Sequence, residues 1–286
     1  MKSIDERIRT LSNGDIVVLG APLDENSSFL RGAAQAPKRI REALHEGSSN
    51  MYSEAGVDLA TTRGWKDIGD LRLGTGAEAI SQIERGISMI LDRGARPLVL
   101  GGDHSITYPS AKACASHFRH LKVLDIDAHP DLYEEYDGNR LSHACPFARL
   151  MEEGLGVSLV QAGIRTANAH QREQARRYGV RMIEMDDWPP AKMPSLTGKV
   201  YLSIDLDGLD PAFAPGVSHH EPGGLTTRDL LNIIQRIDGE IVAADIVELN
   251  PKRDLNGVTA RVASKLYKEI VGLMVSQSRR SRARKR

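Results

Sequence analysis

The sequence has few cysteines, no long apolar run and no net charge. Its 286 residues include two cysteines, Cys114 and Cys145, which are too few for a disulfide framework. No apolar run approaches the roughly 20 residues that a membrane-spanning helix needs, so we expect no membrane association. The segment Met1 to Gly14 is polar and lacks the apolar core of a secretory signal. Together these absences predict a protein of the reducing cytoplasm.

Positive and negative charges balance overall but not locally. The chain has 38 basic and 38 acidic residues. Six of the basic residues fall in the last eight positions: Arg279, Arg280, Arg282, Arg284, Lys285 and Arg286. A basic tail can bind nucleic acid or an anionic membrane. We expect instead a solvated, disordered tail over residues 279–286 and no nucleic-acid partner.

The remaining residues, 1–278, are predicted to form one domain. A hydrophobic content of 41% and a charged content of 27% are typical of a soluble globular protein. We find no internal repeat, low-complexity linker or domain boundary. The length suits one large α/β domain.

Apolar strands alternate with amphipathic helices along the whole chain, which predicts a mostly parallel sheet covered by helices on both faces. Two capping-box patterns, Thr75-x-x-Glu78 and Thr226-x-x-Asp229, mark the starts of two helices. The expected strands are residues 16–19, 97–100, 121–124, 158–162, 199–202 and 240–247. The other expected helices are residues 37–44, 110–118, 146–153, 170–178 and 258–274.

Three short runs of aspartate and histidine follow three of these strands. They are Gly101-Gly102-Asp103-His104, Asp125-Ile126-Asp127-Ala128-His129-Pro130-Asp131 and Ser203-Ile204-Asp205-Leu206-Asp207. Parallel sheets bind ligands at the carboxyl ends of their strands. Burying so many carboxylates in one place is unfavourable unless cations hold them. The runs therefore predict a site for two metal ions.

The spacing within the runs supports this prediction. Alternate side chains of an extended segment share one face, so Asp127, His129 and Asp131 can converge, as can Asp205 and Asp207. Two imidazoles with several carboxylates suit Mn²⁺ best, while Ni²⁺, Co²⁺, Fe²⁺ and Zn²⁺ are possible. A single Asp at a strand end is more often a cap or turn residue. We expect Asp103 and Asp125 either to support the ligands from behind or to act in turns, and Asp210 to act in a turn.

The three runs resemble the signatures of the ureohydrolases, the arginase and agmatinase family. The likeness extends from Leu19 to about Met274. Three further segments are similar to plant-type arginases and their bacterial relatives: Asn26 to Leu30, Gly138 to His143 and Pro215 to His219. The resemblance implies an arginase-like three-layer α/β/α sandwich with a mostly parallel central sheet, assembled as a homo-oligomer, either a trimer or a hexamer.

The resemblance also implies a ligand set for two Mn²⁺ per subunit. One ion would be bound by His104, Asp127, Asp131 and Asp205, and the other by His129, Asp127, Asp205 and Asp207. Two divalent ions that share a water can lower its pKa enough to supply hydroxide near neutral pH. A guanidinium carbon is a poor electrophile, so its hydrolysis needs such a nucleophile. Asp131 is expected to orient it.

Two more residues complete the expected catalytic machinery. His143 matches the proton-shuttling histidine of the family, and its ordinary pKa suits proton transfer; the alternative is a capping or core histidine. By resemblance, Glu248 pairs with the guanidinium of a small guanidino substrate. Cys145 has no task in this chemistry.

Features of the chain point to more than one substrate. Asn139 matches a position that arginases use near the substrate carboxylate, and Asn168 stands where many animal and bacterial arginases have an acidic residue. By this resemblance, we expect both asparagines to bind substrate. The segment Ala144 to Phe147 and Glu221 resemble agmatinases instead. We predict hydrolysis of L-arginine to L-ornithine and urea. The alternatives are hydrolysis of agmatine to putrescine and urea, or of another guanidino compound.

Other classes fit less well. A deacylase of related fold uses a single zinc with fewer carboxylates, and a phosphoesterase would need basic residues within the three runs. Gly74-Thr75-Gly76 is a weak dinucleotide signal because no convincing strand precedes it. The non-enzyme alternative is a catalytically silent partner subunit, which the presence of every expected ligand disfavours.

Overall fold

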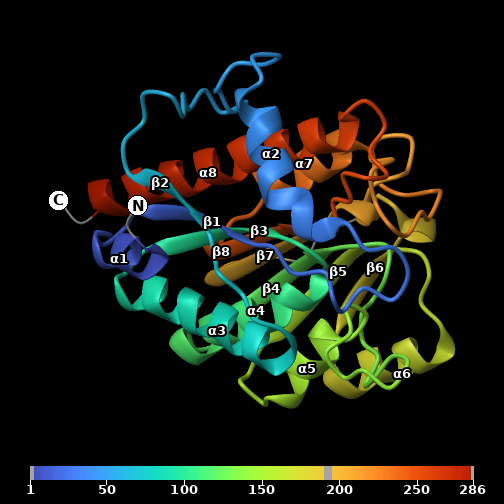
Figure 1. The fold of residues 1–286 in the computed structure, drawn as a ribbon. Coiled ribbons are helices and arrows are strands. Elements are labelled where there is room, and N and C mark those ends of the chain that lie inside the picture. The colour runs from blue at the N-terminus through green and yellow to red at the C-terminus, as the bar shows by residue number, and fades with distance from the viewer. Residues whose placement is uncertain (1–2, 190–194, 285–286) are drawn as a thin grey trace.

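The protein is built on one eight-stranded sheet in which every paired strand is parallel (Figure 1). The computed structural model describes residues 3–189 and 195–284. The strand order across the sheet is β2-β1-β3-β8-β7-β4-β5-β6. The strands are β1 (Ile16–Ala21), β2 (Trp65–Asp70), β3 (Arg96–Gly101), β4 (Lys122–Ile126), β5 (Ser158–Ile164), β6 (Arg181–Glu184), β7 (Lys199–Asp205) and β8 (Glu240–Val247).

Helices cover both faces of the sheet and complete the predicted three-layer sandwich. One layer contains α2 (Ala36–His45), α7 (Thr227–Gln235) and α8 (Val258–Arg284). The other contains α1 (Ile4–Arg9), α3 (Gly76–Asp92), α4 (Thr107–His117), α5 (Pro146–Glu152) and α6 (Ala169–Tyr178). Successive residues of β1 enter opposite cores: Ile16 and Val18 pack in the first, and Val17 and Leu19 in the second. Burial on both faces explains why the central strands are continuously apolar.

The chain order places residues far apart in the sequence at one edge of the sheet. From β3 the chain skips to β4, and β7 and β8 later fill the gap between them. The four adjacent strands β3, β8, β7 and β4 therefore end side by side. Their carboxyl ends carry the three aspartate and histidine runs and Glu248. This is the edge where open parallel sheets bind ligands.

The structure corrects several expected elements. Helix α8 continues to Arg284, past the expected end at Met274, through most of the segment expected to be a tail. Residues 285–286 lie outside the described residues, and the division into a domain and a tail stays a prediction. Thr75 does precede α3, but its side chain makes no capping hydrogen bond. Glu78 accepts instead from Gln82 Nε2 at 3.0 Å, so the expected capping box is not formed.

Among the helices within residues 3–189 and 195–284, none is both long and apolar enough to span a lipid bilayer.

Candidate metal centre and active site

A tight exit from β3 brings His104 to the edge of the sheet. A side chain at Gly102 would place its Cβ 1.6 Å from the Leu23 carbonyl oxygen, so only glycine fits there. Asp103 then caps the short helix His104–Ile106 by accepting from the Ser105 N–H. This confirms the turn role expected for Asp103. His104 is completely buried beside the carboxyl end of β7.

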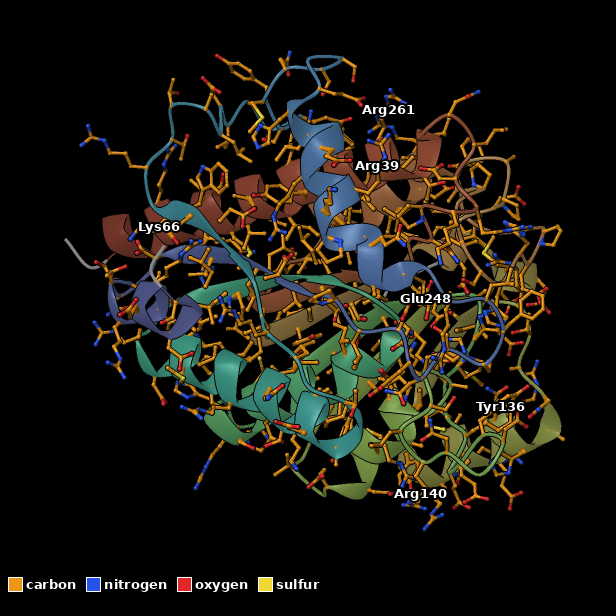
Figure 2. The ribbon with its side chains drawn as sticks, viewed as in Figure 1. Arg39, Lys66, Tyr136, Arg140, Glu248 and Arg261 are labelled. Carbon is orange, nitrogen blue, oxygen red and sulfur yellow. The ribbon has the colours of Figure 1, made fainter. Side chains whose placement is uncertain are left out.

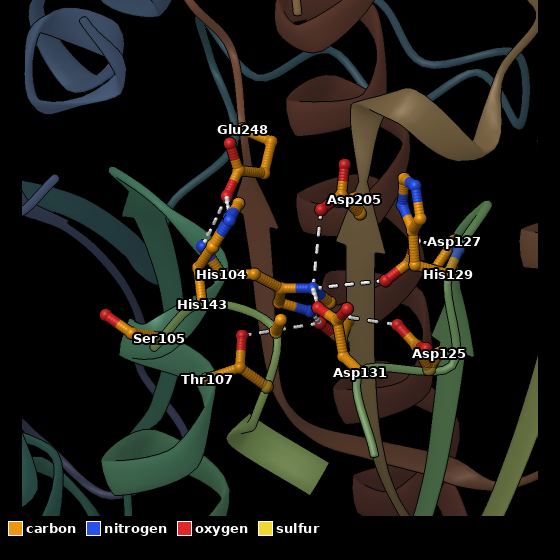
Figure 3. A network of polar contacts seen from close by, with 12 residues as sticks. His104, Ser105, Thr107, Asp125, Asp127, His129, Asp131, His143, Asp205 and Glu248 are labelled. Carbon is orange, nitrogen blue, oxygen red and sulfur yellow. Dashed lines mark hydrogen bonds and ion pairs between the residues drawn. The ribbon is translucent and has the colours of Figure 1, made fainter. Parts of the chain in front are cut away.

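His104 lies against three carboxylates, all of them expected to share a metal with it (Figure 3). Its Nδ1 is 3.1 Å from Asp127, 3.0 Å from Asp131 and 3.3 Å from Asp205. Asp131 follows β4 with φ at 50°, in the left-handed region that aspartate seldom adopts. Backbone strain of this kind is concentrated at functional sites.

The second histidine forms a neighbouring group that shares Asp127 with the first. His129 Nδ1 lies 3.4 Å from Asp127 Oδ1 and 3.1 Å from Asp207 Oδ2. Asp127 thus contacts both histidines, which is the position expected of a bridging ligand. Asp205 lies in the His104 group, and its expected bridging role stays a prediction.

A hydrogen-bonded chain behind His104 fixes which ring nitrogen is free. The Ser203 hydroxyl donates to Asp245 at 2.7 Å, so its oxygen can accept from His104 Nε2, 3.1 Å away. A proton on Nε2 leaves the lone pair of Nδ1 facing the carboxylates. Thr107 also donates to Asp245, at 2.7 Å. Support of this kind orients metal-binding histidines, and we did not predict it from the sequence.

The charge balance of these groups calls for cations. Asp127, Asp131, Asp205 and Asp207 are all buried, with only two imidazoles among them. Burial and the neighbouring Asp207 and Asp127 raise the pKa of Asp205 well above its ordinary value. Asp127 Oδ2 makes no hydrogen bond with the described residues. An oxygen-rich set with two imidazoles fits two divalent metal ions, which would remove the repulsion.

His143 and Glu248 form a buried pair beside the metal-binding groups (Figure 3). His143 Nδ1 lies 2.8 Å from Glu248 Oε1. Burial alone would lower the pKa of His143, but the Glu248 carboxylate raises it to about 9. Glu248 has φ at 65° and accepts from the His104 N–H at 2.8 Å through the same Oε1. Its Oε2 makes no hydrogen bond with the described residues.

Ser28 contacts the other nitrogen of His143 and can serve both of its protonation states. The Ser28 N–H can only donate, and it lies 3.2 Å from Nε2, which accepts when the ring is neutral. The Ser28 hydroxyl lies 2.9 Å from the same nitrogen and can accept from it when the ring is protonated. Both states of His143 are therefore satisfied, as proton transfer requires. Ser28 lies within the segment Asn26 to Leu30 that resembles arginases, but we predicted no role for it from the sequence.

A cavity of ≈ 190 Å³ opens above these groups. Its buried base contains Asp205, Asp207, Glu248 and His143, and its half-buried rim includes Tyr133, Thr166 and Glu221. The complete lining is Ser28, His129, Asp131, Tyr133, Tyr136, His143, Ala144, Thr166, Gln171, Asp205, Asp207, His219, Glu221 and Glu248. Four of the predicted metal ligands, His129, Asp131, Asp205 and Asp207, thus meet the predicted shuttle and guanidinium partner at one opening.

The two predicted substrate-binding asparagines do not line this cavity. The Asn139 amide donates to Asn26 at 3.1 Å and accepts from the Leu141 N–H at 2.8 Å. Asn168 caps α6 by accepting from Gln171 N–H and donates to the Tyr133 hydroxyl at 2.6 Å. Both hold neighbouring loops in place, and their contact with substrate stays a prediction.

The other residues discussed from the sequence have structural surroundings. Asp125 is buried and accepts from Gln161 at 2.9 Å, and Asp210 accepts from the Ala212 N–H at 2.9 Å within a turn. Cys145 is buried without a disulfide bond, and burial raises the pKa of its thiol to about 12. A thiol of that pKa is a poor nucleophile near neutral pH.

Comparison with known proteins agrees with this geometry. The sequence model of the arginase family matches residues 14–272. The chain is 46% identical over 270 residues to arginase 1, mitochondrial, of Arabidopsis thaliana, covering 88% of this chain and 79% of that protein. It is 34% identical over 273 residues to agmatinase of Bacillus anthracis, covering 92% of each.

The solved structures give the same result. The chain superposes on arginase from Medicago truncatula with a TM-score of 0.87 and 42% identity, covering 95% of this chain and 91% of that one. The predicted fold and the resemblance read from the three runs are both confirmed. The chain belongs to the arginase family.

Proposed function

We propose that this protein is a binuclear-metal ureohydrolase that converts L-arginine and water to L-ornithine and urea. The observation that carries the proposal is the sharing of Asp127 by two histidine–carboxylate groups beneath one cavity. The names and similarity of the plant relatives support arginine as substrate.

The metal ions would be held by six side chains: His104, Asp127, His129, Asp131, Asp205 and Asp207. When bound, two divalent ions would neutralise these carboxylates and lower the pKa of a water molecule between them. We propose Mn²⁺ for both positions, with Ni²⁺ or Co²⁺ as possible substitutes, because the set is rich in oxygen.

The remaining catalytic groups would bind the substrate and move a proton. Glu248 Oε2 is free of hydrogen bonds with the described residues and can accept from the substrate guanidinium. His143 would give its proton to the departing amine, while Ser28 and Glu248 hold its ring. Asp131 would orient the attacking water. Asn139 and Asn168 would act on the amino-acid end of the substrate indirectly, by holding the loops that border the cavity.

Agmatine is the second candidate substrate, favoured by the likeness to agmatinase and by Glu221 at the rim of the cavity.

Three further proposals accompany the function. We propose a homo-oligomer, trimeric or hexameric, as the resemblance implies. We propose a cytoplasmic location, supported by two buried cysteines that form no disulfide. We propose that substrate recognition involves neither nucleic acid nor membrane.

The test is urea release by Mn²⁺-loaded protein from L-arginine, agmatine, 4-guanidinobutyrate and guanidine, compared by kcat/KM. We expect the highest value for L-arginine. The highest value for agmatine would replace the proposed substrate but keep the chemistry. Absence of urea from all four, also after loading with Ni²⁺ or Co²⁺, would contradict the proposed function and favour a silent partner subunit.

A further inference from the structure

The rim of the cavity contains a carboxylate without a partner. Glu221 is half-buried and lines the cavity together with the buried residues of the metal centre. Among the described residues its side chain makes no hydrogen bond and no ion pair. The other carboxylates of the lining belong to the metal-binding groups or, for Glu248, to the pair with His143.

The backbone at Glu221 is anchored to the sheet. Arg165, just after β5, donates to the Glu221 carbonyl from Nε at 2.9 Å and from Nη2 at 2.6 Å. The remaining Arg165 hydrogen bonds go to other backbone carbonyls of the same edge. On the other side, Asp210 accepts from the Gly223 N–H at 2.6 Å. The Glu221 backbone is therefore held in place, and the Arg165 guanidinium is occupied by backbone carbonyls rather than paired with the Glu221 carboxylate.

The charges around the cavity favour a cation at its rim. Of the described residues that line it, none is lysine or arginine. Outside the metal-binding groups and the His143–Glu248 pair, the lining offers neutral groups such as the hydroxyls of Tyr133, Tyr136 and Thr166 and the amide of Gln171. Asn168, the position considered from the sequence, is already hydrogen-bonded on both sides of its amide. Glu221 is thus the rim carboxylate available to a ligand.

We propose that Glu221 determines substrate specificity by pairing with an ammonium group at the end of the substrate opposite the guanidinium. This rests on the proposed ureohydrolase function. A guanidino group paired with Glu248 at the buried base would direct the other end of the substrate toward the opening of the same cavity, which Glu221 lines. L-Arginine and agmatine both carry an ammonium group there. 4-Guanidinobutyrate carries only a carboxylate, which Glu221 repels and no lysine or arginine of the described lining attracts.

The test compares Glu221→Gln with a matched control, Glu135→Gln. Glu135 is an exposed acid on the loop of Tyr133 and Tyr136 but does not line the cavity, so the control removes the same charge from the same region. We expect Glu221→Gln to lower kcat/KM for L-arginine and agmatine about tenfold or more, mainly through KM. The value for 4-guanidinobutyrate should stay constant or rise, and metal content should not change. Glu135→Gln should leave every value within about twofold.

The substrate panel separates this inference from the proposed function. If wild-type protein releases urea and Glu221→Gln loses equally with all three substrates, or with none, the assigned role of Glu221 is wrong while the chemistry stands. If wild-type protein releases no urea at all, the proposed function itself fails. Where turnover of 4-guanidinobutyrate is too slow to follow, its inhibition constant against L-arginine replaces kcat/KM. The charge-reversed Glu221→Lys should then bind 4-guanidinobutyrate more tightly than wild type does.

Discussion

Charged side chains are arranged differently at the two edges of the sheet. At the amino ends of β7 and β8, Lys199 and Glu240 form an ion pair of 2.6 Å with side chains 41% and 45% exposed. At the amino end of β1, Asp15 pairs with Lys66 at 2.7 Å. Figure 2 shows Lys66 to the left and Glu248 to the right of the middle of the molecule. At the carboxyl edge, Asp127, Asp131, Asp205 and Asp207 are buried beside the buried His104 and the half-buried His129.

The difference identifies the working edge of the protein. Acids at the amino edge are matched by cations of the same chain, within reach of water, and contribute little to stability. Acids at the carboxyl edge repel one another in a dry environment, which opposes folding unless other cations enter. An arrangement that reduces the stability of the metal-free protein is consistent with selection for binding metal ions rather than for folding.

The largest expected effect follows from removing one charge at the carboxyl edge. Asp205→Asn should lower urea release about 10³-fold or more, because it removes a predicted ligand of both ions. The Asn carbonyl oxygen can still accept from the Asp207 N–H, now 2.8 Å from Asp205 Oδ1, so the turn should persist. Metal content per subunit, measured by atomic emission, should fall in parallel.

The same variant tests the repulsion itself. In metal-free protein, Asp205→Asn should increase the free energy of unfolding by about 1–2 kcal/mol, since the cost of charging or protonating a buried carboxyl beside Asp207 and Asp127 disappears. In metal-loaded protein it should reduce that free energy. Urea unfolding with and without a chelator measures both. A variant that binds two metal ions as wild type does would contradict the predicted ligand set.

The next effect concerns rate without metal loss. His143→Ala should lower kcat about 10²–10⁴-fold, the usual contribution of a positioned acid or base. Metal content should stay at the wild-type value, because His143 contacts Glu248 and Ser28 and is not among the predicted ligands. Parallel loss of metal and activity in this variant would remove the distinction between shuttle and ligand.

The sequence was informative where strands are buried on both faces. β8 was predicted with its observed bounds, Glu240–Val247, because a short and mostly apolar run is typical of a strand that is covered on both faces. The same runs placed the aspartates and histidines at one edge. The Thr226 capping box also forms as predicted. Local patterns sufficed for features in which each residue acts through its neighbours in sequence.

Features that depend on the tertiary arrangement were missed. The edge strand β2 is half-exposed and polar, and β6 contains four residues, so neither has a distinctive pattern. Asp245 interrupts the apolar strand β8, a visible signal, yet its partners Ser203 and Thr107 lie more than 40 residues away in the chain. The contacts of Asn139 and Asn168 with nearby loops were likewise outside the reach of sequence patterns.

A small effect is expected at the amino edge. Lys199→Met should reduce the free energy of unfolding by less than about 1 kcal/mol, since the pair with Glu240 is exposed and water replaces the lost contact. Urea release and metal content should equal those of wild type. A loss of metal from this variant would show that charge at the two edges is coupled, and the comparison between them would no longer hold.

The smallest expected effect is on the pH dependence of stability. The contribution of the surface carboxylate Glu54 to this dependence has the opposite sign from that of Asp131 at the metal centre. A two-point hydrogen bond from Arg228 to Glu54 lowers the pKa of Glu54 from 4.5 to about 2. Its contribution to stability is therefore complete above the unfolded value of 4.5 and is lost as the pH falls toward 2. Burial and the neighbouring Asp127 instead raise the pKa of Asp131 to about 6, so in metal-free protein its protonation stabilises the fold as the pH falls through 6.

Glu54→Gln isolates the acid-side contribution of the surface pair. Because solvent screens Glu54, its loss should reduce the free energy of unfolding by less than about 1 kcal/mol at pH near 6 and by nothing measurable at pH near 2. Urea unfolding of metal-free protein at several pH values between these limits measures the difference. The gain in stability from Asp131 protonation should persist in the variant, because the pKa of that carboxylate is set by burial, Asp127 and the two histidines and not by Glu54. If Glu54→Gln also abolished the gain in stability from Asp131 protonation, the surface pair and the metal centre would be electrostatically coupled.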